Sequence, residues 1–355
     1  EPEVFAKAKV FLLPKDYVRF AMTGQIHMDY SDAAGTLLLD IAAKKWSIEL
    51  CELLDIPVSL CPPLVESTDF VGTVTKEFAE KTGLSEKTKV FAGGADNACG
   101  AVGSGILTEG KTLCSIGTSG VVLSYEPTSM KDFHGKVHYF NHAEKDAYYT
   151  MGVTLAAGYS LSWFKDTFAK DEDFDAFLEG IEDIPAGSGG LLFTPYIVGE
   201  RTPHADSQIR GSFIGVDSGH TQKHFVRAVI EGITFSLNES IEIFRESGKT
   251  VDTVISIGGG AKNKTWLQIQ ADIFNAKVLK LASEQGPGLG AAMIAAYGCG
   301  WFNSLAECAD QFIQVIEEYE PNQENVEQYQ KIYRIYRDIY ENTKELSHRL
   351  SEFRK

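Results

Sequence analysis

Basic residues are in short supply in this sequence of 355 residues. Lysine and arginine together number 33, against 49 aspartate and glutamate residues, which gives a formal net charge of −16 at pH 7. Nucleic acids and anionic membranes are bound through clustered lysine and arginine, so the composition argues against both as partners. A phosphate-bearing ligand would have to be held by local features, because the overall field of the chain repels it.

Long apolar stretches and paired cysteines are also missing. No apolar run approaches the ~18 residues that a membrane-spanning helix needs, so we expect a cytoplasmic protein with no membrane partner. The cysteines lack CxxC spacing, so neither a disulfide framework nor a thiolate zinc site is indicated, and we expect reduced, mostly buried thiols. The six positions are Cys51, Cys61, Cys99, Cys114, Cys299 and Cys308.

No metal site and no P-loop are predicted. His134, His138 and His142 are spaced by four residues, but the residues between them fit a strand or hairpin, which would scatter the imidazoles. The phosphate-binding pattern GxxxxGK[ST] occurs at 105–112, but a strand pattern rather than a helix follows it, which argues against a P-loop enzyme.

What is present is an ordinary globular composition with alternating strand and helix patterns. The chain is 44% hydrophobic and 11% aromatic, enough for two domains with substantial cores. Strands that alternate with helices predict an α/β fold with internal parallel pairing, and a domain boundary is expected near 107–110. We expect helices at 15–22, 47–54, 155–168, 220–247, 265–274, 289–296 and from 325 onward, and strands at 89–92, 112–116, 121–125, 190–193, 253–257 and 277–281.

An acidic residue, Asp96, follows a strand and two glycines in the sequence AGGADN at 92–97. It precedes a helical stretch of small residues, and a helix N-terminus favours a charged carboxylate. Such a carboxylate could accept a proton in phosphoryl transfer, which needs only a weak, well-placed base. On local grounds alone, a helix N-cap is the simpler interpretation.

Two glycine-rich turns could approach a phosphate or a nucleotide. SIGTSG at 115–120 joins two strand patterns and is either a phosphate-binding turn or an ordinary hairpin turn. ISIGGGAKN at 255–263 runs from a strand into a helix and partly imitates a dinucleotide-binding fingerprint, with Glu284 at roughly the distance of the ribose-binding acid. The third glycine position is Asn263, which weakens a dehydrogenase interpretation.

A polar, proline-bounded stretch contains Glu200 and Arg201. These two residues could clamp a ligand, or they could form an ion pair between domains.

Together these segments resemble the FGGY family of carbohydrate kinases. The matching segments occur in family order along essentially the whole chain. They are KDY at 15–17 with TG at 23–24, MDYSD at 28–32, the stretch 92–103, the turn 115–120, GERTP at 199–203, the triple glycine at 258–260, and EQGPGLG at 284–290.

The resemblance implies the actin-like ATPase fold, with two α/β domains of ribonuclease-H-like topology and a cleft where ATP and sugar meet. It implies transfer of the γ-phosphoryl group of ATP, with Mg²⁺, to a primary hydroxyl, here O5 of D-xylulose. Residues 1–107 correspond to part of the sugar-binding domain, and 108–355 to the nucleotide-binding domain with a C-terminal helix.

Residue by residue, the resemblance assigns roles to eight positions. It implies that Asp96 is the catalytic base and a sugar contact, and that Asn97 is a second sugar contact. It implies nucleotide contacts from a set of six residues that come from three motifs. These are Thr118, Ser119, Gly158, Ser162, Gly259 and Asn263.

The sequence departs from the family at its start. Members begin with an Asp-Gly-Thr phosphate loop and several sugar-pocket residues, and these are not present, so we expect the first domain to be incomplete at its N-terminus and these 355 residues alone to be inactive. Exposed sheet edges would then favour association, and a homodimer is one expected form. Other substrates such as gluconate, ribulose or glycerol, and a non-catalytic actin-like ATP-binding protein, stay open as alternatives.

Overall fold

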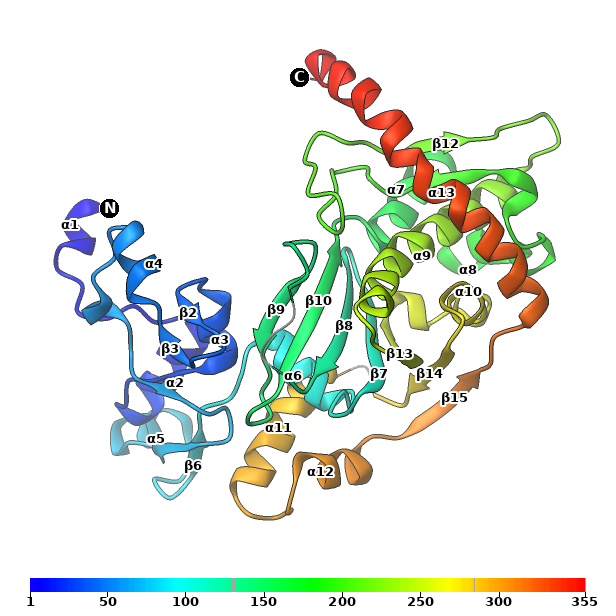
Figure 1. Cartoon of the computed structure of the whole chain (residues 1–355). Helices are drawn as coiled ribbons and strands as arrows, with labels where there is room; N and C mark the ends of the chain where they lie inside the picture. Colours follow the sequence, from blue (N-terminus) through cyan, green and yellow to red (C-terminus); the bar gives the residue numbers. More distant parts are fainter. Residues whose placement is uncertain (129–131, 284, 355) are drawn as a thin grey trace.

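The computed structural model describes residues 1–128, 132–283 and 285–354, which form a small N-terminal lobe beside a larger lobe (Figure 1). Glu284 lies outside the described residues. The small lobe consists of short elements around a small core that includes Met28, Ala33 and Leu39. Its elements are α1 (Pro2–Phe5), α2 (Pro14–Thr23), β1 (Met28–Asp29), α3 (Tyr30–Gly35), β2 (Leu39–Asp40), β3 (Lys45–Trp46), α4 (Ile48–Leu53), η1 (Val58–Leu60), β4 (Leu64–Val65), β5 (Phe70–Thr73), α5 (Lys76–Thr82) and β6 (Lys89–Phe91).

The larger lobe is built on a seven-stranded mixed sheet with the order β15-β14-β13-β7-β8-β10-β9. The predicted parallel pairing is confirmed for β7, β13 and β14, whereas β8, β9, β10 and β15 pair antiparallel. The strands are β7 (Gly110–Ile116), β8 (Gly120–Glu126), β9 (His138–Asn141), β10 (Tyr148–Thr154), β13 (Val251–Gly258), β14 (Lys277–Leu281) and β15 (Val315–Tyr319), and a separate pair is formed by β11 (Leu192–Thr194) and β12 (Ser212–Ile214).

Helices cover both faces of this sheet (Figure 1). One face carries α6 (Asp96–Gly103), α11 (Gly286–Gly298) and α12 (Leu305–Phe312). The other face carries α7 (Gly158–Phe168), α9 (Gln222–Glu246) and α10 (Lys264–Phe274), followed outward by α13 (Gln323–Leu350). Shorter helices are α8 (Phe174–Leu178), η2 (Ile181–Asp183), η3 (Ser188–Gly190), η4 (Gly259–Ala261) and η5 (Ser351–Phe353).

Alternation along the strands divides the apolar residues between two cores. Leu113 and Leu123 pack into the core with α6 and α11, while their neighbours Cys114 and Val122 pack into the core with α7 and α9. Successive side chains of a strand point to opposite faces, so a strand with apolar residues at every position is one buried on both faces. The strands β10 and β13 are followed along the chain by the helices α7 and α10, which lie on one face of the sheet.

Local signals explain where the predicted helices begin and end. Pro14 is the first residue of α2, and Gly24 ends the helix in the left-handed conformation with φ of 71°. Ser47 caps α4 by accepting the N–H of Leu50 at 3.2 Å. Four of the six thiols are buried, as predicted, and all six are free in the structure. Within the described ranges, none of the helices is both long and apolar enough to cross a membrane.

Candidate active site

Three glycine-rich segments far apart in the sequence meet around one cavity of the larger lobe, with a volume of about 510 Å³. Five of the six residues named above for nucleotide contacts line it: Thr118, Gly158, Ser162, Gly259 and Asn263. Ser119 stands apart from this wall, and its carbonyl oxygen accepts the N–H of Gly117 at 2.9 Å, which closes the turn between β7 and β8. We call this space the nucleotide cavity.

Two backbone hydrogen bonds join the 117–119 turn to the start of α7. Gly158 N donates to Gly117 O at 2.8 Å, and Tyr159 N donates to Thr118 O at 3.1 Å. The first N–H groups of a helix lack partners within the helix, and the turn supplies two acceptors. A Cβ atom on residue 158 would lie 2.5 Å from Gly117 O, so this approach requires glycine. Both N–H groups are used within the fold, and a phosphate here must be bound by other donors.

The apolar wall of the nucleotide cavity was missed by sequence reasoning. It includes Phe174 and Leu178 from α8 and Trp266 from α10. Asn263 caps α10 by accepting the N–H of Trp266 at 2.9 Å, and Trp266 Nε1 donates to Thr234 Oγ1 at 3.0 Å, which fixes the indole ring. A flat apolar wall with a few polar groups suits a nucleobase. In the sequence, the position of Trp266 three residues after the helix cap Asn263 was the signal that could have indicated it. No sequence motif marks α8.

A second cavity, of about 690 Å³, contains Asp96 and is called the Asp96 cavity. Its wall combines residues of both lobes. They are Leu13, Pro14, Lys15, Asp32, Gly94, Ala95, Asp96, Cys99, Pro287, Gly288 and Ala291. The wall therefore brings together α2, α3, α6 and α11, although these elements are spread over most of the chain.

Asp96 is the first residue of α6, and the N-cap is Ala95, so the interpretation of Asp96 as the N-cap is wrong. The carboxylate is exposed and accepts the N–H of Asn97 at 2.7 Å and the Asn97 side-chain amide at 3.2 Å. Asn97 thus lies beside Asp96, as the sequence order requires. An exposed carboxylate at the positive end of a helix is a competent proton acceptor.

Helix α6 is held unusually close to α11. A Cβ atom on Gly290 would lie 1.8 Å from the carbonyl oxygen of Cys99, and one on Gly103 would lie 1.9 Å from the carbonyl oxygen of Gly286. Backbones can approach to this distance only where side chains are absent. The position of Asp96 therefore depends on the contact between these two helices.

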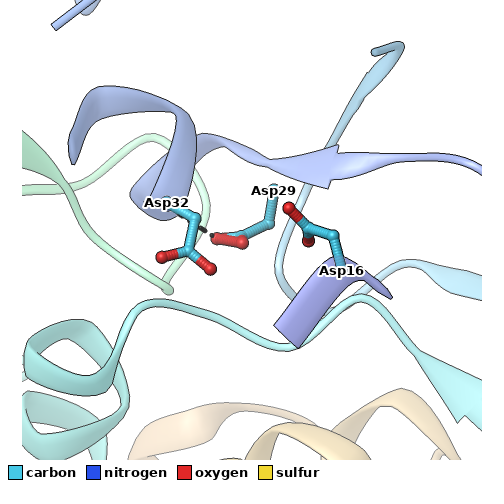
Figure 2. Close-up of side chains that lie close together, drawn as sticks. All are labelled: Asp16, Asp29 and Asp32. Atoms are coloured by element: carbon cyan, nitrogen blue, oxygen red, sulfur yellow. Dashed lines mark hydrogen bonds between the residues drawn. The ribbon is translucent and has the colours of Figure 1, made fainter. Parts of the chain in front are cut away.

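Three carboxylates gather near the Asp96 cavity, and Figure 2 shows how Asp16, Asp29 and Asp32 point toward one another. One carboxylate oxygen of each residue lies within 4.8 Å of the others, a grouping that could hold a metal ion. The ammonium of Lys15 occupies this position instead, at 3.2 Å from Asp16, 2.8 Å from Asp29 and 3.1 Å from Asp32. Burial, together with the nearby Asp29 carboxylate, raises the pKa of Asp32 to about 6. Lys15, Asp16, Asp29 and Asp32 are called the lysine cluster.

Among the described residues, Glu200 forms no ion pair with the small lobe and is instead buried within the larger lobe. Its side chain is 3% exposed and accepts hydrogen bonds from Thr154 Oγ1 at 2.5 Å, Leu155 N at 3.0 Å, Arg201 N at 2.7 Å and Ser236 Oγ at 3.3 Å. All of these partners belong to the larger lobe. Glu200 therefore fixes the connection from β10 to α7, the helix that begins at the nucleotide cavity.

Because Glu200 is buried, the free energy of unfolding should depend on pH. Desolvation raises the pKa of Glu200 from 4.5 to about 7, although the hydrogen bonds that it accepts favour the ionised form. The folded protein therefore binds this proton more tightly than the unfolded chain, and the resulting stabilisation is complete below pH 4.5 and lost as the pH rises through 7. Relative to Glu200→Gln, the wild type should lose roughly 3 kcal/mol of unfolding free energy between pH 5 and 8, at 1.36 kcal/mol per pKa unit.

Urea unfolding of both proteins at pH 5 and pH 8 measures this difference. Glutamine keeps the shape and one acceptor oxygen but cannot titrate, so it serves as the matched control. Parallel stability curves for the two proteins would contradict the assignment.

Comparison with known proteins identifies the fold. Residues 1–103 match the N-terminal domain of the FGGY family of carbohydrate kinases, and residues 112–299 match its C-terminal domain. The chain belongs to this family. It therefore has the two-domain actin-like ATPase fold and is a carbohydrate kinase, a class of enzyme that takes its phosphoryl group from ATP.

Several relatives of this FGGY kinase are named for their substrates. The xylulose kinase of Bacillus subtilis is 65% identical over 355 residues, which cover 100% of this chain and 71% of that protein. The ligand-bound xylulose kinase from Lactobacillus acidophilus has a TM-score of 0.92 at 30% identity, over 96% of this chain and 69% of that one. A gluconate kinase from Lactobacillus acidophilus matches with the same values. Structural likeness alone therefore leaves the sugar open.

Proposed function

We propose that this FGGY kinase transfers the γ-phosphoryl group of ATP to the O5 hydroxyl of D-xylulose, giving D-xylulose 5-phosphate and ADP. The observation that carries the proposal is the 65% identity to the xylulose kinase of Bacillus subtilis over the whole of this chain. The two cavities support it, since one has the wall of a nucleotide site and the other holds an exposed carboxylate at a helix N-terminus.

Asp96 is the proposed general base. Its carboxylate accepts the proton of the O5 hydroxyl while that oxygen bonds to the γ-phosphorus, and the bond from this phosphorus to the β–γ bridging oxygen breaks. Asn97 lies on the same helical turn and offers an amide that can bind another hydroxyl of the sugar. The exposure of Asp96 supports this role, because a sugar can reach the carboxylate without rearrangement of the fold.

ATP is proposed to lie in the nucleotide cavity, with its base against Phe174 and Trp266. The lining residues Thr118, Gly259 and Asn263 offer hydroxyl, backbone and amide groups to the ribose and phosphates. Mg²⁺, when bound with ATP, would neutralise charge on the β- and γ-phosphates. We assign Mg²⁺ no protein ligand. The cluster of three carboxylates found among the described residues is already bonded to Lys15.

A panel of sugars tests the substrate. The protein expressed from its complete gene should release ADP with D-xylulose at a kcat/KM at least about tenfold above that with ribulose, gluconate or glycerol, as a pocket fitted to one set of hydroxyls discriminates against others. Highest activity on gluconate would instead assign gluconate as the substrate, which the structural comparison leaves open. Failure of every sugar to stimulate ADP release would favour a non-catalytic ATP-binding protein.

The remaining assignments are predictions of the same proposal. Residues 1–107 are assigned to the sugar side and 108–355 to the nucleotide side, and homodimer formation and a cytoplasmic location are expected. Gel filtration with light scattering tests homodimer formation.

A further inference from the structure

The segment 92–95, which leads into α6 and sets the position of Asp96, is bonded to the small lobe at several backbone groups. The carbonyl oxygen of Ala92 accepts from Arg19 Nη1 at 2.6 Å and from Lys15 Nζ at 3.3 Å. The N–H of Ala95, immediately before Asp96, donates to Ser31 Oγ at 2.9 Å. Both lysine and arginine come from α2, so one helix of the small lobe holds the start of this segment.

The lysine cluster fixes the ammonium that makes one of these contacts. Asp29 is buried and, besides binding Lys15, accepts from Ser31 N at 3.1 Å and Ser31 Oγ at 2.5 Å. Because the same Ser31 oxygen accepts from Ala95, the cluster reaches the segment 92–95 through Lys15 at one end and through Ser31 at the other. Asp32 completes the cluster and lines the Asp96 cavity together with Lys15.

Charge attraction holds the ammonium of Lys15 among its three carboxylate partners. Burial alone would lower the pKa of Lys15, but the carboxylates of Asp29, Asp32 and Asp16 outweigh burial and raise it. The ammonium is therefore charged throughout the working pH range. An ammonium with three fixed carboxylate partners has little freedom to leave the carbonyl of Ala92, since each partner restricts the long side chain further.

We propose that Lys15 is a positioning residue for Asp96: held by its three aspartates, it anchors Ala92 and thereby sets where the carboxylate of Asp96 meets the sugar hydroxyl. This inference rests on the proposed role of Asp96. Lys15 makes no bond to the reacting atoms in this assignment. Its effect is on geometry, and a displacement of about 1 Å at a reacting group can cost on the order of 100-fold in rate.

The test is Lys15→Met in the protein expressed from its complete gene. We expect kcat with D-xylulose and ATP to fall about 10- to 100-fold, while KM for ATP and KM for the sugar change less than about threefold. The matched control is Lys44→Met in the same lobe. Lys44 also bridges two carboxylates, Glu66 at 3.0 Å and Asp146 at 2.9 Å, but its partners lie outside 92–95, and kcat should stay within about twofold of the wild type.

A double variant separates the loss of the contact between Lys15 and Ala92 from the loss of a positive charge. Among the described residues, Lys15→Met leaves Arg19, at 3.0 Å from Asp16, as the cation paired with the carboxylates of the lysine cluster, and this excess of negative charge could lower stability and activity together. In a Lys15→Met, Asp32→Asn double variant one negative charge is removed, so thermal stability should recover. The fold-loss in kcat relative to Asp32→Asn alone should be the same as the loss caused by Lys15→Met in the wild type.

Three results would overturn the proposal. A kcat that is unchanged in Lys15→Met shows that Arg19 alone holds Ala92 in place and that the contact from Lys15 is not needed. Full recovery of kcat in the double variant shows that charge balance, not the contact to Ala92, was responsible. A large rise in sugar KM at constant kcat makes Lys15 a direct sugar ligand. The wild type is assayed first, and if no sugar supports its turnover, the proposed function has failed rather than the assignment of Lys15.

Discussion

Asp96→Asn is expected to lower kcat for sugar phosphorylation about 10²- to 10⁴-fold, the range that general base catalysis supplies. Asparagine has nearly the same shape, so sugar binding measured by titration calorimetry should change less than about threefold. Asp96 is exposed, and its loss of charge at the start of α6 should cost no more than about 1 kcal/mol of stability. A rate effect without a binding or folding effect is the signature of a base.

Asp40→Asn is the matched control for this variant. Asp40 is also exposed and accepts a nearby backbone N–H, that of Ala43 at 2.9 Å, but it is not among the residues that line the Asp96 cavity. The kcat of Asp40→Asn should equal that of the wild type. Turnover by Asp96→Asn within tenfold of the wild type would remove Asp96 from the role of base.

Gly290→Ala is expected to be the most destabilising single-methyl change in the larger lobe, with a loss of at least about 3 kcal/mol. The new Cβ atom would lie 1.8 Å from the carbonyl oxygen of Cys99, a backbone atom that cannot rotate away. Helices α6 and α11 would have to separate. Since α6 begins with Asp96, any protein that still folds should also lose kcat.

Gly288→Ala provides the control on the same helix. The region where its Cβ atom would lie is open, with no heavy atom of the described residues within 4 Å. Alanine favours a helix over glycine by roughly 1 kcal/mol, so thermal stability should stay the same or rise. Equal melting temperatures for the two variants would show that the helix contact tolerates a methyl group.

Elements with local signals could be predicted from the sequence. Pro14 and Gly24 bound α2, Ser47 begins α4, and glycines mark the turns that follow β7 and β13. Each predicted helix and strand ends within three residues of its observed counterpart. The short helix α3 and the strand β10 were not predicted, because α3 has only six residues and β10 is buried along its whole length without alternation.

The candidate site could be predicted only where motifs carry it. The family resemblance assigned Gly158 and Gly259, which the fold brings to one cavity. The lysine cluster could not be predicted, because the bond between Lys15 and Ala92 joins residues 77 positions apart and depends on how α2 meets β6. The buried position of Glu200 could not be predicted, since its hydroxyl partners lie on β10 and α9, far from it in the sequence.

Helix α6 belongs to both lobes in different ways. The loop before its first residue is bonded to the small lobe, whereas its buried side chains Ala98, Ala101 and Val102 pack into the core beneath the sheet of the larger lobe. The first residue of this helix is therefore tied to both halves of the molecule, and a substitution in either half that loosens its contact to α6 or to the loop before it can shift Asp96.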